Sequence, residues 1–220
     1  MSARDRILDR LRRSAPAAAP SGMPSLGGDA PAKHVDAQVA AMTAALTAAH
    51  ADVVRVEGPA APSLAGAIAR FCADRGLRSL MLPNGPLPFD PLVDTSTLRV
   101  QRFDRPFEAV KDQLFRDTDA GLTVADCAIA DTGTLVMASS PEQPRTLSLV
   151  PPIHLCVLDL RRIHPTMAAA MRAERWSSGL PTNLIFVSGP SKTADIQQTL
   201  AYGAHGPKEL VLFLYDGATR

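Results

Sequence analysis

Short apolar runs alternate with amphipathic or alanine-rich segments along most of this chain. An apolar run bounded by turn residues is typical of a strand, and apolar positions three or four apart are typical of a helix. This pattern predicts strands at 53–56, 79–82, 98–103, 154–158, 183–187 and 209–215, and helices at 32–49, 63–74, 107–114, 160–172 and 193–202. Strands that alternate with helices form parallel βαβ units, so we expect an α/β fold with a mostly parallel sheet flanked by helices.

One segment breaks this alternation. Residues 127–130 and 134–137 are apolar and flank the tripeptide Asp131-Thr132-Gly133. Two apolar runs separated by a short turn that contains glycine predict a β-hairpin. We therefore expect a local antiparallel element within the otherwise parallel fold.

The first part of the chain has a different character. Ile7, Leu8 and Leu11 lie at helical spacing among five arginines, which predicts a short basic helix over residues 3–13. Residues 14–31 are mainly Ala, Pro, Gly and Ser, a composition that favours a flexible tether. We expect an N-terminal extension at residues 1–31 and an α/β domain at 32–220, with the first helix docked on this chain or on a partner.

Charge and hydropathy narrow the class of protein. Lys and Arg number 23 against 22 Asp and Glu, a net charge of +1, whereas nucleic-acid binders normally have a basic excess. No apolar run approaches the roughly 18 residues that span a bilayer, and the N-terminus is charged where a secretory signal is apolar. We expect a cytoplasmic protein that binds no nucleic acid and has no membrane span.

The cysteines and histidines show no metal motif. Cys72, Cys127 and Cys156 are far apart, have apolar neighbours and are typical of buried, reduced thiols. The chain has no C-x-x-C, and its five histidines have no H-x-x-x-H spacing. We therefore expect no metal ligands and no cofactor or iron–sulfur cluster bound by this chain.

The segment 188–195, Ser-Gly-Pro-Ser-Lys-Thr-Ala-Asp, lies between a predicted strand and a predicted helix. Free N–H groups of a first helical turn and the helix dipole favour anions, and the hydroxyls add donors. The candidate ligand-binding residues are Ser188, Gly189, Ser191, Thr193 and Asp195. The alternative is an ordinary helix start, capped by Ser191 or Thr193, with Asp195 offsetting the dipole.

The predicted hairpin turn offers a second group of candidates. Asp131 and Thr132 are candidate catalytic residues, since a carboxylate can act as a base or nucleophile, and Gly133 and Thr134 are candidate ligand contacts. The alternative is that Asp and Gly occur here because both tolerate turn conformations.

Two histidines complete the candidates. His154 opens an apolar strand after two prolines and is either catalytic or a buried structural group. His205 lies in a glycine-rich loop and is a candidate ligand contact. A helix over 193–202 would be roughly 15 Å long and would put Asp195 and His205 at opposite edges of the sheet.

Taken together, these motifs resemble the LUD-domain family, in its lactate utilisation protein C branch. The resemblance covers about Ala32 to Asp216 and is carried by 128–135 (Ala-Ile-Ala-Asp-Thr-Gly-Thr-Leu), 151–154 (Pro-Pro-Ile-His), 188–196 and 203–207 (Gly-Ala-His-Gly-Pro). It implies a fold like that of the NagB/RpiA/CoA-transferase group. It also implies a place in a three-protein system that oxidises L-lactate to pyruvate, in which the partner proteins carry the iron–sulfur clusters.

Three functions follow as hypotheses. In the first, the chain is a subunit of a lactate-oxidising complex and binds a small carboxylate or other anion in a cleft at the carboxyl edge of the sheet. In the second, on fold analogy alone, it is a free-standing isomerase or CoA-transferase-like enzyme that uses Asp131. In the third, it is a non-catalytic assembly or regulatory protein that holds a partner through its N-terminal helix.

Overall fold

The structure, a computed structural model, describes residues 3–14, 35–58, 60–89, 92, 94–194, 200–203 and 205–217. The chain divides into two units, Met1–Ala30 and Pro31–Arg220. The first contains helix α1 (Ala3–Ser14), as the spacing of its apolar residues predicts, with Ile7 and Leu8 exposed. The expected tether, beyond Ser14, lies outside the described residues.

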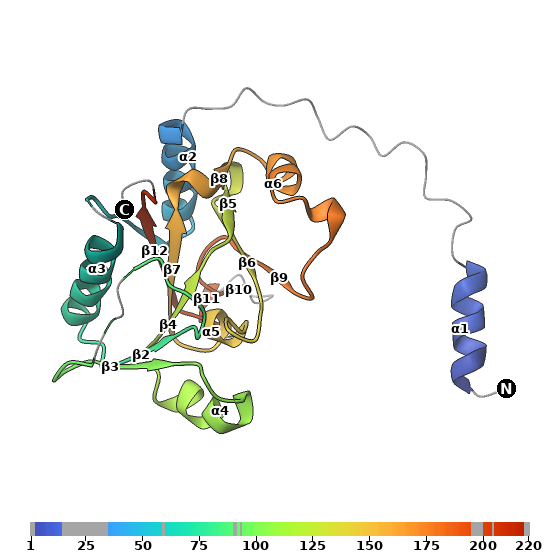
Figure 1. The fold of residues 1–220 in the computed structure, drawn as a ribbon, viewed down its shortest axis with the longest axis horizontal. Helices are drawn as coiled ribbons and strands as arrows, with labels where there is room; N and C mark the ends of the chain where they lie inside the picture. The colour runs from blue at the N-terminus through green and yellow to red at the C-terminus, as the bar shows by residue number, and fades with distance from the viewer. Residues whose placement is uncertain are drawn as a thin grey trace. The chain divides into compact units, whose positions relative to one another are not determined.

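The second unit is built on a six-stranded sheet in which every neighbouring pair is parallel (Figure 1). In spatial order its strands are β1 (Asp52–Arg55), β12 (Glu209–Tyr215), β7 (Ile153–Asp159), β4 (Ala120–Val124), β2 (Ser79–Leu82) and β3 (Arg99–Arg102). The central strands are mainly apolar because both faces of a parallel sheet are covered. The expected α/β class is confirmed.

A second, four-stranded sheet packs against the first. Its order is β8 (Ile163–His164), β5 (Cys127–Ile129), β6 (Thr134–Ala138) and β9 (Leu184–Val187). Strands β5 and β6 pair antiparallel around a 3-10 turn, η1 (Ala130–Thr132), which confirms the hairpin. The strand expected at 183–187 is confirmed as β9, but it pairs antiparallel with β6 in this second sheet, is only partly buried, and does not belong to the parallel sheet.

The helices complete a layered arrangement. Helix α3 (Ala60–Asp74) covers one face of the six-stranded sheet, and α2 (Val35–Ala48) and the second sheet cover the other. Helix α6 (Met167–Ala173) covers the outer face of the second sheet, so α3 and α6 lie on opposite sides in Figure 1. The remaining helices are α4 (Phe107–Arg116), α5 (Thr146–Leu149), η2 (Leu160–Arg162) and η3 (Trp176–Ser178). No helix in the described ranges is both long and apolar enough to cross a membrane.

The helix expected at 160–172 is shorter than predicted. Residues 163–164 extend to pair with β5, and α6 begins only after Thr166, whose Oγ1 accepts a hydrogen bond from the N–H of Ala169 at 3.2 Å. Pro165 favours this boundary because the residue before a proline avoids the helical conformation.

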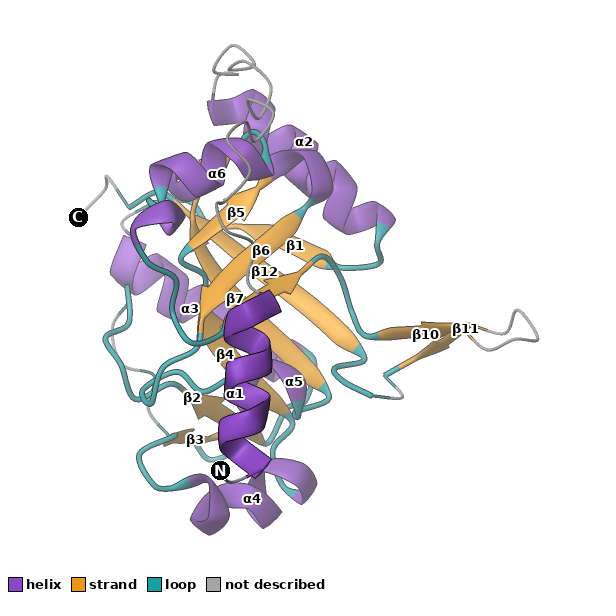
Figure 2. Cartoon of the chain, turned by 90° about the vertical axis from the view of Figure 1, so that its right-hand side faces the viewer, coloured by secondary structure: helices purple, strands orange, loops and turns teal. Residues whose placement is uncertain are grey.

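The helix expected at 193–202 is wrong in the part that the structure describes. Strand β10 (Lys192–Ala194) pairs antiparallel with β11 (Leu200–Tyr202), and this pair projects from the side of the domain in Figure 2. Two backbone hydrogen bonds hold the segment extended, from Ser191 N–H to Pro207 O and from Gly203 N–H to Ser191 O, each 2.9 Å. Tertiary pairing has overridden the local helical pattern.

Gly133 provides a test of the packing between the hairpin and α2. Its φ is 60°, and a Cβ added there would lie 2.8 Å from Ala45 Cβ and 3.0 Å from Leu46 N. We expect Gly133→Ala to lower the free energy of unfolding by about 2–4 kcal/mol, because overpacking adds to the cost of a left-handed conformation.

Gly76→Ala is the matched control, since Gly76 has a φ of 64° but nothing within 4 Å of the added carbon. Its free energy of unfolding should fall only by the cost of the left-handed conformation, about 1–2 kcal/mol. Urea unfolding of both variants measures the difference. Equal losses would show that the contact with α2 contributes nothing.

Candidate functional site

A cavity of about 180 Å³ lies where β7 and β12 begin, and five of the sequence candidates line it. These are His154, Ser188, Gly189, Ser191 and His205. His154 and Leu210 are the second residues of their strands and stand opposite each other in the register. The cavity is therefore at the amino edge of the six-stranded sheet, and the expected position at the carboxyl edge is wrong for Ser188, Gly189 and Ser191.

The expected separation of Asp195 from His205 assumed a helix over 193–202, with a loop that folds back as the alternative. Asp195 lies outside the described residues, and the folded-back loop is what the structure shows for His205. Strand β11 brings the chain back beside β10, so the loop with His205 meets the loop with Ser191. The approach is close, since a Cβ added to Gly206 would lie 3.0 Å from Ser191 Cβ. Glycine at 206 is what allows this contact.

The helix start that was expected to supply free backbone amides is replaced, in the described part of this segment, by strand β10. The N–H of Ser191 donates to Pro207 O, and Pro190 has no N–H. The polar groups that the cavity does offer are the side chains of Ser148, His154, Ser188, Ser191 and His205. Among the residues that the structure describes, its lining contains no lysine or arginine. Any anion held here would depend on neutral hydrogen-bond donors and on His205.

His154 is the most deeply placed of these groups, with 1% of its surface exposed. Its Nε2 lies 2.8 Å from Thr123 Oγ1, which lies 3.1 Å from Met137 Sδ on the second sheet. Burial lowers the pKa of His154 to about 4, so the ring is neutral at pH 7. His154 also lines the cavity, which puts its ring within reach of a ligand there.

The hairpin candidates lie beside the cavity and connect to it through hydroxyls. Thr132 Oγ1 lies 2.6 Å from Thr134 Oγ1, which lies 2.8 Å from Ser188 Oγ. Asp131 and Thr132 are exposed and do not line the cavity, and the N–H of Asp131 donates to Pro165 O at 3.2 Å. Gly133 packs against α2. Ser188 is thus the residue that joins the two candidate groups.

Two candidates cannot be placed in full. Thr193 belongs to β10, and only its backbone is described, while Asp195 lies outside the described residues.

The structure adds residues that sequence reasoning missed. Thr123 lies on β4, which the apolar pattern did not predict, and Ser148 lies on the four-residue helix α5. The apolar part of the cavity wall includes Leu149, Val187 and Leu210. No local pattern marks these residues, because they meet only through the order of the strands.

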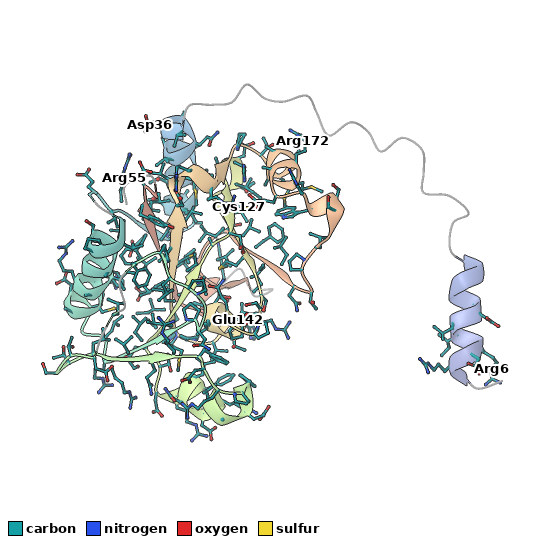
Figure 3. All side chains as sticks on the ribbon, in the orientation of Figure 1. Arg6, Asp36, Arg55, Cys127, Glu142 and Arg172 are labelled. Carbon is teal, nitrogen blue, oxygen red and sulfur yellow. The ribbon has the colours of Figure 1, made fainter. Side chains whose placement is uncertain are left out.

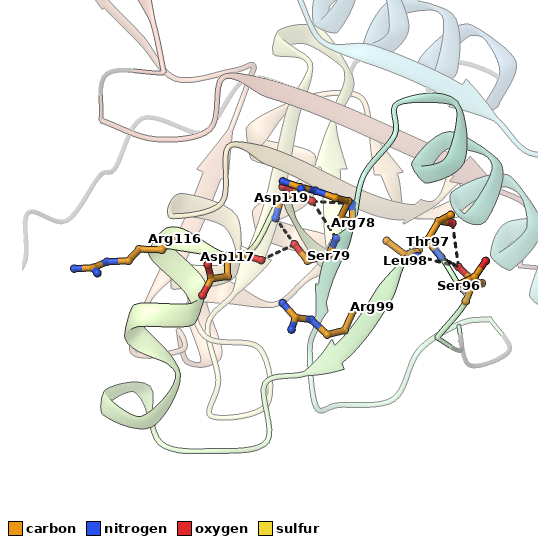
Figure 4. A pocket seen from close by; sticks show the side chains of 10 residues that line it. Arg78, Ser79, Ser96, Thr97, Leu98, Arg99, Arg116, Asp117 and Asp119 are labelled. Carbon is orange, nitrogen blue, oxygen red and sulfur yellow. Dashed lines mark hydrogen bonds between the residues drawn. The ribbon is translucent and has the colours of Figure 1, made fainter.

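A larger and more open cleft of about 670 Å³ lies where β2 and β3 begin (Figure 4). Arg78, Arg99 and Arg116 lie around it. Its buried polar groups are already satisfied: Asp119 Oδ2 accepts hydrogen bonds from the N–H groups of Arg78 (2.7 Å) and Ser79 (3.0 Å). These bonds fasten the loops to one another, so the smaller cavity is the better candidate site.

Comparisons with known proteins identify the family and support the fold. Residues 39–215 match the LUD domain. An uncharacterized protein of Neisseria meningitidis is 46% identical over 143 residues, which cover 63% of this chain and 61% of that protein. Proteins called lactate utilization protein C are 39% identical over 93 residues in Exiguobacterium sp. and 34% over 101 residues in Shouchella clausii. These cover 40% and 44% of each chain, so this chain matches less than two thirds of each relative's length.

A solved structure shares the fold. A DUF162 family protein from Deinococcus radiodurans superposes with a TM-score of 0.58 over 83% of this chain and 99% of that chain. The two sequences are 24% identical, so this likeness concerns the fold alone.

His154 makes stability depend on pH. Its pKa is about 4 when folded against an ordinary 6.5, so as pH falls below 6.5 the unfolded chain binds a proton that the folded chain does not. We expect the free energy of unfolding to fall between pH 6.5 and pH 4, by about 3 kcal/mol in total from this residue. Urea unfolding across this range measures the loss.

His154→Gln should remove that part of the pH dependence, whereas His205→Gln, at an exposed position, should keep it. If His154→Gln loses stability toward pH 4 as steeply as the unmodified chain, another group is responsible.

Proposed function

The chain belongs to the LUD domain family, and from this premise we propose that it is a subunit of an L-lactate utilisation system that oxidises lactate to pyruvate with iron–sulfur partner proteins. The names of its relatives support this proposal. The observation that carries it is the cavity in which His154, Ser188, Ser191 and His205 converge from separate parts of the chain.

The cavity suits a small 2-hydroxy or 2-oxo acid. Its volume of about 180 Å³ is well below the roughly 300–1,000 Å³ of sites for drug-sized ligands. The apolar wall of Leu149, Val187 and Leu210 accommodates a methyl group, and the hydroxyl and imidazole groups donate to a carboxylate. Lactate and pyruvate have this combination of one methyl and one carboxylate.

Thr123 sets the role of His154. The hydroxyl has one proton, and an imidazole nitrogen is a much stronger acceptor than the thioether of Met137. The contact between Thr123 Oγ1 and Nε2 fits either tautomer of the ring, and we assign the one in which Thr123 donates to Nε2 and the ring proton resides on Nδ1. In this tautomer His154 donates a hydrogen bond to a ligand oxygen and does not abstract a proton, which suits a group that binds and polarises the ligand.

The hairpin residues act indirectly in this proposal. Thr132 and Thr134 position Ser188 through the two hydroxyl contacts, and Gly133 fixes the hairpin against α2. Asp131 is exposed outside the cavity, so we assign it no contact with the ligand. This placement favours the subunit proposal over an enzyme that uses Asp131 as base or nucleophile on a ligand in this cavity.

Calorimetric titration of the purified chain with L-lactate and with pyruvate tests the ligand proposal. We expect saturable binding of both, with L-lactamide, which has no carboxylate, binding more weakly. His154→Gln should raise Kd about fivefold and the double variant Ser188→Ala/Ser191→Ala about thirtyfold, since they remove one and two hydrogen bonds worth about 1 kcal/mol apiece.

Ser96→Ala, in the arginine-lined cleft, is the control and should leave Kd unchanged. Binding that is lost in Arg99→Ala and kept in His154→Gln would place the ligand in the other cleft. Absence of any saturable heat would reject the ligand class.

Co-purification tests the partner proposal. We expect the full chain to purify with its iron–sulfur partners when they are expressed together, and Ile7→Ser/Leu8→Ser to weaken this, because both side chains are exposed on α1. A chain that lacks residues 1–31 should keep the affinity for lactate and lose the partners. Retention of the partners by that shorter chain would assign the contact to the α/β domain instead.

A further inference from the structure

Three potential metal ligands meet on the outer face of the second sheet. Cys127 lies on β5, His164 on β8, and Glu174 is the C-cap residue of α6. One ligand atom from each lies within 4.8 Å of the other two. Figure 3 shows Cys127 on the second sheet, in the region next to α6.

The strand register explains why they meet. His164 is paired with Ile129, and Cys127 precedes Ile129 by two residues, so all three side chains project from the same face of the sheet. Helix α6 covers that face and ends at Glu174. The arrangement is therefore fixed by the sheet and one helix end, not by a flexible loop.

The Glu174 carboxylate is held in a defined orientation. Its Oε1 lies 2.9 Å from His164 Nε2, and its Oε2 accepts a hydrogen bond from Arg162 Nη2 at 2.7 Å. Arg162 is itself fixed, because its Nε donates to Asp126 O at 2.8 Å. Outer groups that orient a ligand in this way are typical of metal sites.

The site is shielded from solvent. Cys127 is fully buried, and the side chains of His164 and Glu174 are 17% and 14% exposed. An ion pair between His164 and Glu174 accounts for two of the groups but not for the thiol directed at both. Burial, with the charge of Glu174, raises the pKa of Cys127 to about 12, so without a cation this thiol is neutral and a poor nucleophile.

We propose that Cys127, His164 and Glu174 bind a divalent transition metal ion of the zinc class. Thiolate, imidazole and carboxylate are the three ligand types that zinc takes, and a water completes four-coordination. Thiolate and imidazole select against magnesium and calcium. Binding forms an S–metal bond and releases the thiol proton to solvent. At metal–ligand distances of about 2.0–2.3 Å the ligand atoms would lie roughly 3.3–3.7 Å apart. The 2.9 Å contact between His164 Nε2 and Glu174 Oε1 would therefore widen slightly, while all three ligand atoms stay within their present limit of 4.8 Å.

The expectation of no metal site rested on missing C-x-x-C and H-x-x-x-H motifs. Here each ligand comes from a different element, so no local spacing could reveal the set. The ion would fasten α6 to β5 and β8.

Metal titration of the full, tag-free chain after treatment with a chelator tests this proposal. We expect one Co²⁺ per chain, with a near-ultraviolet thiolate-to-cobalt absorption band that Zn²⁺ abolishes by displacement. We also expect Zn²⁺ to raise the Tm, because it binds only the folded chain. Cys127→Ser, His164→Gln and Glu174→Gln should each weaken binding at least about tenfold.

Two variants serve as controls. Cys72→Ser replaces a buried thiol in α3, and His205→Gln replaces an exposed imidazole, and both should bind cobalt like the unmodified chain. Circular dichroism checks that each variant is folded. If Cys127→Ser does not fold, cobalt binding by His164→Gln tests the proposal instead, since this variant keeps the buried thiol.

The outcomes separate a metal site from an ion pair. If His164 and Glu174 form only an ion pair, Glu174→Gln lowers the Tm by the same amount with and without Zn²⁺. In a metal site the zinc-dependent increase in Tm disappears with that substitution. No cobalt band in the unmodified chain, or an unchanged band in Cys127→Ser, overturns the proposal.

Discussion

The parallel pairing of β7 with β12 is the constraint on which the rest of the domain depends. All seven residues of each strand are in register, from Ile153 with Glu209 to Asp159 with Tyr215. This register brings the loops that precede both strands to one edge of the sheet. Those loops carry His205 and end next to His154, so the cavity is a direct consequence of the pairing. Successive side chains along a strand point to opposite faces of the sheet, so alternation determines which residues contact α3 and which contact the second sheet.

The face that includes His154 packs against the second sheet. Cys156, Leu158, Leu212 and Leu214 fill the space between the sheets with apolar side chains. His154 and Thr123 are the polar exception, and they contact each other at 2.8 Å with 1% and 2% of their surfaces exposed. Burial keeps the imidazole neutral, and its contact with Thr123 joins β7 to β4. The structural interpretation of His154 is therefore observed, and its contact with a ligand is part of the proposal.

Much of this organisation follows from local sequence, and the failures have physical causes. Apolar runs predicted β7 and β12, helical spacing predicted α2 and α3, and the Asp-Thr-Gly turn predicted the hairpin. Strand β4 was missed because Gly121 and Thr123 interrupt its apolar run. The segment after Ser191 was misassigned because its strand pairing depends on backbone bonds to Pro207 and from Gly203, which no local pattern encodes. His154, Ser191 and His205 were each identified, but their meeting place could not be, since it depends on strand order.

The proposed metal site and the ligand cavity are connected by one row of paired residues that runs across the strands of the second sheet. His164 pairs with Ile129, Ile129 pairs with Thr134, and Thr134 Oγ1 contacts Ser188 Oγ at the cavity. The row therefore runs from the metal-ligand cluster to the ligand cavity through two strand pairings and one hydroxyl contact. Strand pairings are stiff compared with side-chain contacts because each is fixed by backbone hydrogen bonds on both strands. An ion that fixes His164 would also fix the position of Thr134, and with it the orientation of Ser188. The outer face of this sheet would thus stabilise the geometry that its edge presents to a ligand.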